Sequence, residues 1–310
     1  MRVAMAYIGV IMIWSTTPLA LKWSTETTGF LFAVTSRMGI GTAIAVLFCF
    51  MMGRELPHDR LALKTYAASG SGAYLAMMFT YWGAQYIPSG WISVIFGLAP
   101  IITSILAARY LAERNIGVTK IAALVVSLMG LWVMFQHSLE MGSDVVYGIA
   151  AVVGGVFFYS LSIVAVKQIN AVVPPTAVMT GTLVVATTLF LATWLIGGFQ
   201  APTAIPTRSA GAILYLSIVG SVLGFMLFYY VLQNVEATRA SLITLITPGN
   251  ALILGNLLNK EAITTDVILG TTLVVGGLLL FQYGGQIGWN RKIRFNLFRR
   301  NKLGTIYKTD

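Results

Sequence analysis

"GLAPIITSILAARYLAERN", residues Gly97–Asn115, shares a pattern with "LITPGNALILGNLLNKEAI", residues Leu245–Ile263. Each stretch places a proline at its fourth position and a glutamate at its seventeenth. Proline removes a helix hydrogen bond and clashes with the preceding turn, so its recurrence inside apolar, helix-like runs needs a reason. The two copies are offset by 148 residues, which indicates that the chain consists of two related halves.

The composition indicates a membrane protein. Of its 310 residues, 57% are hydrophobic and only 10% are charged, whereas soluble domains carry about 25% charged residues. The apolar residues form blocks of about 20, the length of a helix that crosses a bilayer, and not the alternating segments of a membrane barrel. The sequence therefore predicts an all-α integral membrane protein with ten transmembrane helices. We place these helices at residues 4–22, 29–52, 65–86, 90–111, 118–136, 146–166, 174–197, 210–232, 239–258 and 267–286.

Several chemistries find no support in the sequence. Cys49 is the only cysteine, which excludes a disulfide within the chain and a multi-cysteine metal site. The chain has no Walker motif for ATP-driven pumping. The first apolar block lacks a small-residue cleavage pattern and is expected to be a retained helix. We expect neither a cofactor nor a metal ion.

The positive charges predict how the chain is oriented. With the N-terminus inside, the short cytoplasmic segments hold nine Lys and Arg residues, and the external loops hold three. Cytoplasmic loops of membrane proteins carry such an excess. The basic tail, residues 287–310, falls on the same side when the number of helices is even. We therefore expect both termini in the cytoplasm and a bacterial inner membrane as the location.

The tail mixes its cations with Trp289, Phe295 and Phe298. Because it directly follows a membrane helix, we expect it to bind anionic lipid headgroups. A nucleic-acid-binding or partner-binding arm is the alternative, and we expect no nucleic acid.

The repeat covers most of the chain. The offset of 148 pairs Tyr81 with Tyr229, and an offset of 145 aligns the first helices of the two halves. This predicts a first half at 1–138 and a second half at 146–286, with five helices each. Because five is odd, the second half must enter the membrane from the opposite side. Inverted repeats are typical of secondary transporters, whose substrate site lies near the midplane between the halves.

The sequence also resembles a known family. "PSGWISVIFGLAPIITSILAARYLAERN" (Pro88–Asn115) and "ATRASLITLITPGNALILGNLLNKEAIT" (Ala237–Thr264) are similar to the signature of EamA-type transporters in the drug/metabolite transporter superfamily. "WSTTPLALK" in the first helix and Arg37 in the second fit that family too. The resemblance covers Met1–Gly285. It implies ten helices around a central cavity, cytoplasmic termini, and movement of small organic metabolites, often outward.

The repeated prolines suggest hinges. Pro100 and Pro248 each free one backbone carbonyl at membrane depth, which is tolerated beside other polar groups or a wet cavity. We expect both to kink their helices around the cavity and ease bending, with Gly97 and Gly249 loosening the same turns. A static kink is the alternative.

Glu113 and Glu261 are acids at predicted helix ends, beside Arg114 and Lys260. We expect them to fix helix depth by pairing with a neighbouring cation. A gate-side ion pair is the alternative.

Arg37 is the only charged residue well inside a predicted span. Intramembrane charges usually face the bundle interior or water and tend to be functional. Two roles are open: binding a substrate carboxylate through the planar guanidinium, or bonding backbone carbonyls to hold helices together. The second half has no matching arginine, since its corresponding region reads "PPTAVMTGTLVV".

Aromatic and amide residues complete the predicted substrate path. Any single aromatic residue in a membrane helix is more often structural. No carboxylate falls in the middle of a predicted helix, which argues against efflux of quaternary amines and favours facilitated diffusion over proton coupling. The candidates are Trp14, Tyr74, Tyr81, Phe96, Tyr159, Tyr229 and Asn250.

These observations predict a transporter, acting as an exporter or facilitator of small neutral or zwitterionic metabolites such as amino acids. Its mechanism would be alternating access between two inverted halves. The alternative is a proton-coupled or exchange carrier of phosphorylated sugars, nucleotide sugars or lipid-linked metabolites. An enzyme is disfavoured because no base lies mid-membrane beside a nucleophile. The abundant glycine permits close helix packing within the chain or in a homodimer.

Overall fold

The structure, a computed structural model, describes residues 2–111, 118–136, 143–198 and 201–283. Every regular element in these ranges is helical. In chain order they are α1 (Arg2–Thr25), α2 (Phe30–Met51), α3 (Arg60–Gly83), α4 (Ser89–Phe96), α5 (Ala99–Tyr110), α6 (Val118–Phe135), α7 (Ser143–Ile169), α8 (Pro175–Ile196), α9 (Thr207–Tyr215), η2 (Leu216–Leu223), α10 (Gly224–Asn234), α11 (Ala237–Ser241), α12 (Ile243–Asn259) and α13 (Thr265–Tyr283).

Most helices lie close to the predicted spans, but α3 is displaced toward the N-terminus. The prediction placed a span at 65–86, whereas α3 covers Arg60–Gly83. Asp59 caps the helix, because its Oδ2 accepts from the backbone N–H groups of Leu61 and Ala62 at 3.1 and 3.2 Å. Hydropathy alone misses this polar first turn, which a capping side chain initiates.

Three of the predicted spans are interrupted. The span at 90–111 divides into α4 and α5, and the span at 239–258 divides into α11 and α12 at Leu242. The span at 210–232 contains η2, a π-helical segment of eight residues between α9 and α10. π-Helical turns are rare and occur frequently at functional sites.

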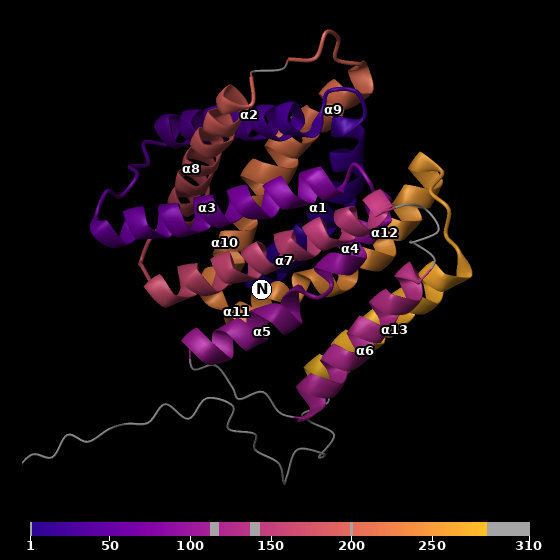
Figure 1. Cartoon of the computed structure of the whole chain (residues 1–310). Coiled ribbons are helices and arrows are strands. Elements are labelled where there is room, and N and C mark those ends of the chain that lie inside the picture. The colour runs from indigo at the N-terminus through magenta and orange to yellow at the C-terminus, as the bar shows by residue number, and fades with distance from the viewer. Residues whose placement is uncertain (1, 112–117, 137–142, 199–200, 284–310) are drawn as a thin grey trace, which may run out of the picture.

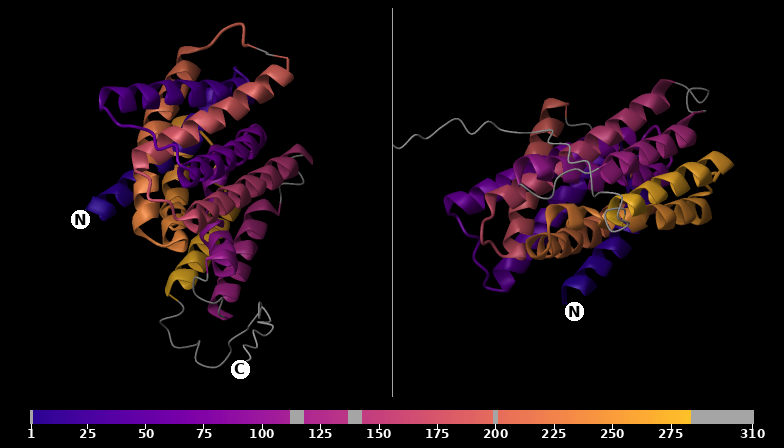
Figure 2. Two further views of the ribbon diagram at one scale, coloured as in Figure 1. Left: turned by 90° about the vertical axis from the view of Figure 1, so that its left-hand side faces the viewer. Right: turned by 90° about the horizontal axis from the view of Figure 1, so that it is seen from below.

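Helices from the N-terminal and C-terminal parts of the chain interleave (Figures 1 and 2). α1 packs against α9, α10 and α12, and α3 packs against α7 and α8. α2 packs against α8 and η2, while α5 packs against α7 and α11. Most of the helix packing therefore joins the two parts, although helices within each part also contact one another.

α6 and α13 form the most extensive helix pair and lie side by side at the periphery (Figure 1). Gly130 and Gly270 permit the close approach: a Cβ on Gly130 would lie 2.6 Å from the Gly270 carbonyl oxygen, and one on Gly270 would lie 2.5 Å from the Gly130 oxygen. Small residues at such crossings are typical of membrane helices.

Within the described ranges, eight helical segments are long and apolar enough to cross a membrane. α4 with α5, α9 through α10, and α11 with α12 each count as one such segment. α6 contributes a shorter apolar helix, Thr119–Phe135, and α3 falls outside the set. Many large apolar side chains are exposed on the outside, including Met12, Phe50, Trp132 and Ile196, as expected of a lipid-facing surface.

Candidate substrate cavity

A central cavity of about 130 Å³ lies between the interleaved helices. One water needs roughly 10–15 Å³, so the space suits a small solute. The lining comes from α1, α2, α3, α4, α7, α10 and α12. Five of the residues predicted for the substrate path line it: Trp14, Arg37, Phe96, Tyr159 and Tyr229.

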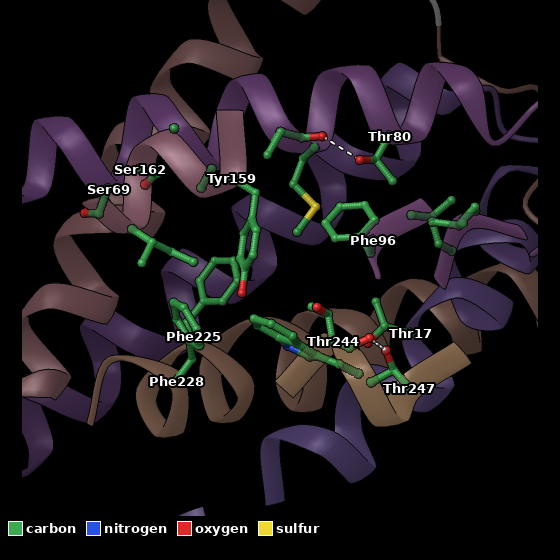
Figure 3. A pocket seen from close by; sticks show the side chains of 18 of the residues that line it. Thr17, Ser69, Thr80, Phe96, Tyr159, Ser162, Phe225, Phe228, Thr244 and Thr247 are labelled. Carbon is green, nitrogen blue, oxygen red and sulfur yellow. Dashed lines mark hydrogen bonds between the residues drawn. The ribbon is translucent and has the colours of Figure 1, made fainter. Parts of the chain in front are cut away.

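Four aromatic side chains form one cluster in this cavity, and we call Trp14, Phe96, Tyr159 and Phe228 the aromatic cluster. Trp14 lies 5.1 Å from Phe228 and 5.9 Å from Tyr159 between ring centroids. Tyr159 lies 5.8 Å from Phe96 and 6.0 Å from Phe228. These separations are typical of attractive aromatic pairs. Figure 3 shows Tyr159 between Phe96 on one side and Phe225 and Phe228 on the other.

Arg37 is 1% exposed and is the only charged residue among the described residues that line the cavity. Its Nε donates to Ser221 Oγ at 2.9 Å, and its Nη1 donates to the Tyr81 hydroxyl at 3.2 Å. In the described ranges no carboxylate lies within ion-pair distance of its guanidinium. A buried guanidinium held only by neutral groups is electrostatically incomplete, because charge burial is offset chiefly by a counter-charge.

Thr182 occupies the position in α8 that Arg37 occupies in α2, at the repeat offset of 145. Thr182 Oγ1 donates to the Tyr229 hydroxyl at 3.1 Å and lies 2.6 Å from Ser69 Oγ. The two groups are therefore built alike. One contains Arg37, Tyr81 and Ser221, and the other contains Thr182, Tyr229 and Ser69. In each, a residue of the second helix in its half binds one tyrosine and one serine, and only Arg37 is charged.

The π-helix η2 delivers the serine that holds Arg37. Ser221 and Gly220 both belong to η2, and a Cβ on Gly220 would lie 3.1 Å from Arg37 Nη2. A side chain at this position would therefore require the Arg37 guanidinium to shift by a few tenths of an ångström. Ser221, Thr182 and Phe228 were not predicted, because nothing in an apolar run marks a serine, threonine or phenylalanine as cavity-facing. The repeat offset was the one signal that pointed to Thr182.

The remaining predicted path residues lie outside the lining. The Tyr74 hydroxyl is 2.7 Å from Thr193 Oγ1, and its ring packs on Phe190. Tyr81 is fully buried and supports Arg37. Asn250 Nδ2 donates to Ser15 Oγ at 3.3 Å and links α12 to α1.

The predicted hinge residues lie in different settings. α4 ends at Phe96, and α5 begins at Ala99 with Pro100 in its first turn. Gly97 and Leu98 lie between the two helices, so the chain is interrupted just before Pro100, which cannot donate a hydrogen bond. Pro248 instead lies inside the continuous helix α12, and a Cβ on Gly249 would meet nothing within 4 Å. The bending role of these residues stays a prediction.

Glu261 lies just beyond α12 and caps another helix. Its carboxylate oxygens accept from the backbone N–H groups of Ser89 and Gly90, at 3.1 and 3.2 Å, at the start of α4. Asn259 Nδ2 donates to it at 2.9 Å. A carboxylate is favourable at a helix N-terminus. We predicted a partner among the adjacent cations, but in the described ranges these backbone and amide donors bind the Glu261 carboxylate. Its repeat partner Glu113 lies outside the described residues.

Lys22 secures the other side of the same turn. Its Nζ donates to the carbonyl oxygens of Ala84 and Ile87 at 2.7 and 3.0 Å, after the end of α3. Lys22 from α1 and Glu261 after α12 thus hold the α3–α4 turn from two sides. We call this arrangement the turn clamp. The basic tail at 287–310 lies outside the described residues.

Comparison with known proteins gives a consistent result. The model of the "EamA-like transporter family" matches residues 1–136 and 146–283. An "uncharacterized transporter" of Archaeoglobus fulgidus is 27% identical over 276 residues, covering 87% of this chain and 95% of that protein. A "probable terminal-alkyne amino-acid exporter" of Streptantibioticus cattleyicolor is 22% identical, covering 89% of this chain and 91% of that protein.

A solved crystal structure has the same fold. It superposes with a TM-score of 0.69 at 17% sequence identity, covering 92% of this chain and 98% of that one. Together with the apolar helices, these matches identify a multi-pass integral membrane protein of transporter type.

Proposed function

Because this chain belongs to the EamA-like transporter family, we propose that it carries small zwitterionic or neutral metabolites, such as amino acids, across the membrane. The observation that carries this proposal is Arg37. It is a buried guanidinium in a cavity whose described lining offers no acid. A substrate carboxylate supplies the missing counter-charge and binds a guanidinium with two parallel hydrogen bonds.

The rest of the lining suits a substrate with an apolar body. The aromatic cluster provides ring faces, and the hydroxyls of Thr17, Thr244 and Thr247 lie across the cavity from Tyr159 (Figure 3). Ligand sites of this kind are mostly apolar, with a few polar groups that fix orientation. A phosphorylated sugar would bring several negative charges to a single guanidinium, so the cavity favours the amino-acid class.

We propose alternating access between two inverted five-helix halves as the mechanism. Reciprocal packing supports it: α3 packs on α7 as α1 packs on α9 and α10, and α1 packs on α12 as α5 packs on α7. The two separate matches of the family model support it as well. Residues from both parts of the chain line the cavity, which fits a carrier that binds substrate between its two halves. Cytoplasmic termini follow from the distribution of Lys and Arg.

The direction of transport is part of the proposal. One relative is named for export of a terminal-alkyne amino acid, which supports export or downhill facilitation here. In the described residues no acid lines the cavity, so the site itself offers no carboxylate to couple a proton.

Counterflow in liposomes with the purified protein tests the proposal. The panel contains radiolabelled amino acids, a sugar phosphate and a quaternary amine, each with and without a pH gradient. We expect exchange of amino acids that is indifferent to pH and that falls at least tenfold in Arg37→Gln, because a charge-assisted pair is lost.

The matched control is Arg208→Gln. This substitution also removes one positive charge. The Arg208 side chain, however, is 47% exposed beside Glu26 and does not line the cavity. This variant should exchange amino acids like the wild type. Exchange of sugar phosphates alone, or equal losses in both variants, would contradict the proposal.

A further inference from the structure

The hydroxyl of Tyr159 is a buried polar group without a hydrogen-bond partner in the described structure. Buried hydroxyls nearly always have a partner, so each exception calls for an explanation. Seven buried side-chain polar atoms of the described residues share this state, and among those seven residues Tyr159 alone lines the central cavity. Figure 3 shows its ring reaching from α7 into the cavity.

The other tyrosines near the cavity are satisfied. The Tyr229 hydroxyl accepts from Thr182 at 3.1 Å, and the Tyr81 hydroxyl accepts from Arg37 at 3.2 Å. The Tyr74 hydroxyl is paired with Thr193. Tyr159 therefore differs from its neighbours in having a free donor and a free acceptor at the cavity, the combination that a ligand would complete.

The surroundings of this hydroxyl suit a cation. Trp14 and Phe96 meet the Tyr159 ring edge to face at 5.9 and 5.8 Å, and Phe228 is tilted against it at 6.0 Å. Aromatic faces attract ammonium groups, most strongly when the site is desolvated. The described lining offers no carboxylate that would do the same.

Given the proposed function, on which this step rests, we propose that Tyr159 and the aromatic cluster receive the ammonium group of an amino-acid substrate while Arg37 receives its carboxylate. Arg37 comes from α2 and Tyr159 from α7, so the substrate joins the first half to the second. The cavity then selects zwitterions over carboxylates without an amine. It makes this selection with a neutral hydroxyl and ring faces.

Three ligands of one shape test this assignment: leucine, 4-methylpentanoate, which lacks the amine, and 3-methylbutylamine, which lacks the carboxylate. Their affinities are measured on the purified wild type, Tyr159→Phe and Arg37→Lys in lipid nanodiscs. We expect the wild type to bind leucine most tightly. Tyr159→Phe should weaken leucine about tenfold, as loss of a charge-assisted hydrogen bond does, and leave 4-methylpentanoate unchanged. Arg37→Lys should weaken both carboxylates.

Tyr229→Phe is the matched control, since it removes a cavity-lining hydroxyl that already has a partner. It should leave the ratio of leucine to 4-methylpentanoate affinity unchanged. The melting temperature of ligand-free Tyr159→Phe should equal or exceed that of the wild type, because the lost hydroxyl made no hydrogen bond.

The outcomes separate the two proposals. Equal weakening of leucine and 4-methylpentanoate by Tyr159→Phe, or no effect on leucine, overturns the role of Tyr159 and leaves the proposed function intact. A wild type that binds neither leucine nor 4-methylpentanoate overturns the proposed function, and the assignment of Tyr159 with it.

Discussion

Arg37 and Thr182 show how one substitution distinguishes two otherwise similar groups. Each side chain bonds a tyrosine and a serine. Thr182 completes a neutral network, whereas Arg37 is a buried charge with no carboxylate partner among the described residues. Sequence analysis could single out Arg37, because a charge within an apolar span is conspicuous. Ser221 could not be predicted in this way, because a serine within an apolar run carries no such mark.

Gly220 should matter for binding and not for folding. In Gly220→Ala, a Cβ would lie 3.1 Å from Arg37 Nη2, so the guanidinium must shift by a few tenths of an ångström. We expect affinity for amino acids to fall by roughly 3- to 10-fold, because bidentate hydrogen bonds depend on alignment. Binding assays on the purified protein would measure this.

Gly211→Ala is the control for that variant, since a Cβ there meets nothing within 4 Å. Both substitutions place alanine for glycine in a helical segment, which favours helix by up to about 1 kcal/mol. Melting temperatures should therefore not fall in either variant. Wild-type affinity in Gly220→Ala would show that the η2 backbone does not restrict Arg37.

At the scale of the elements, hydropathy located the helices well and their interruptions poorly. The break between α4 and α5 lies next to Pro100, where a sequence rule predicts a disturbance. The break at Leu242 precedes Pro248 by six residues, and the π-helix carries no distinguishing residues. Neither position is marked by a residue that a sequence rule would recognise.

The turn clamp should contribute to stability. Glu261→Ala removes a carboxylate that accepts two backbone N–H groups at the start of α4. We expect it to lower the free energy of unfolding by about 1–3 kcal/mol, because both the hydrogen bonds and the favourable helix-dipole interaction are lost. Thermal unfolding in detergent, followed by circular dichroism, measures the change.

Glu236→Ala provides the comparison. Glu236 also precedes a helix, α11, but makes no capping hydrogen bond with its side chain. Its contact with Arg239 is an exposed pair at 3.4 Å, which contributes about 0–1 kcal/mol. Equal destabilisation by the two substitutions would mean that the Glu261 cap contributes no more to the free energy of unfolding than the exposed Glu236 side chain does.

For the whole molecule, the repeat makes a geometric prediction about sidedness. His58 and Thr203 are related by the offset of 145, and both lie exposed in the loops after α2 and α8. In an inverted arrangement they face opposite sides of the membrane. The only native cysteine, Cys49, is buried beside Thr180. Cys49→Ser removes it, so that each introduced cysteine is the only thiol available for labelling.

Labelling of introduced cysteines with a membrane-impermeant maleimide shows which side of the membrane each loop faces. On the Cys49→Ser background, His58→Cys should react only from the cytoplasmic side and Thr203→Cys only from outside, because the Lys and Arg distribution predicts a cytoplasmic N-terminus. Labelling of both from the same side would contradict the inverted arrangement. Labelling of each from the side opposite to its expected one would reverse the orientation alone.

The single charge on Arg37 has a consequence for the response to membrane voltage. Thr182 offers no opposing charge on the second half, so any movement of Arg37 along the membrane normal is electrically uncompensated. A full charge crossing the bilayer changes the free energy by about 2.3 kcal/mol per 100 mV, so a displacement through a tenth of the field changes it by only about 0.2 kcal/mol. This is below thermal energy. A net-neutral zwitterion should therefore move according to its own concentration gradient, almost independently of the membrane potential.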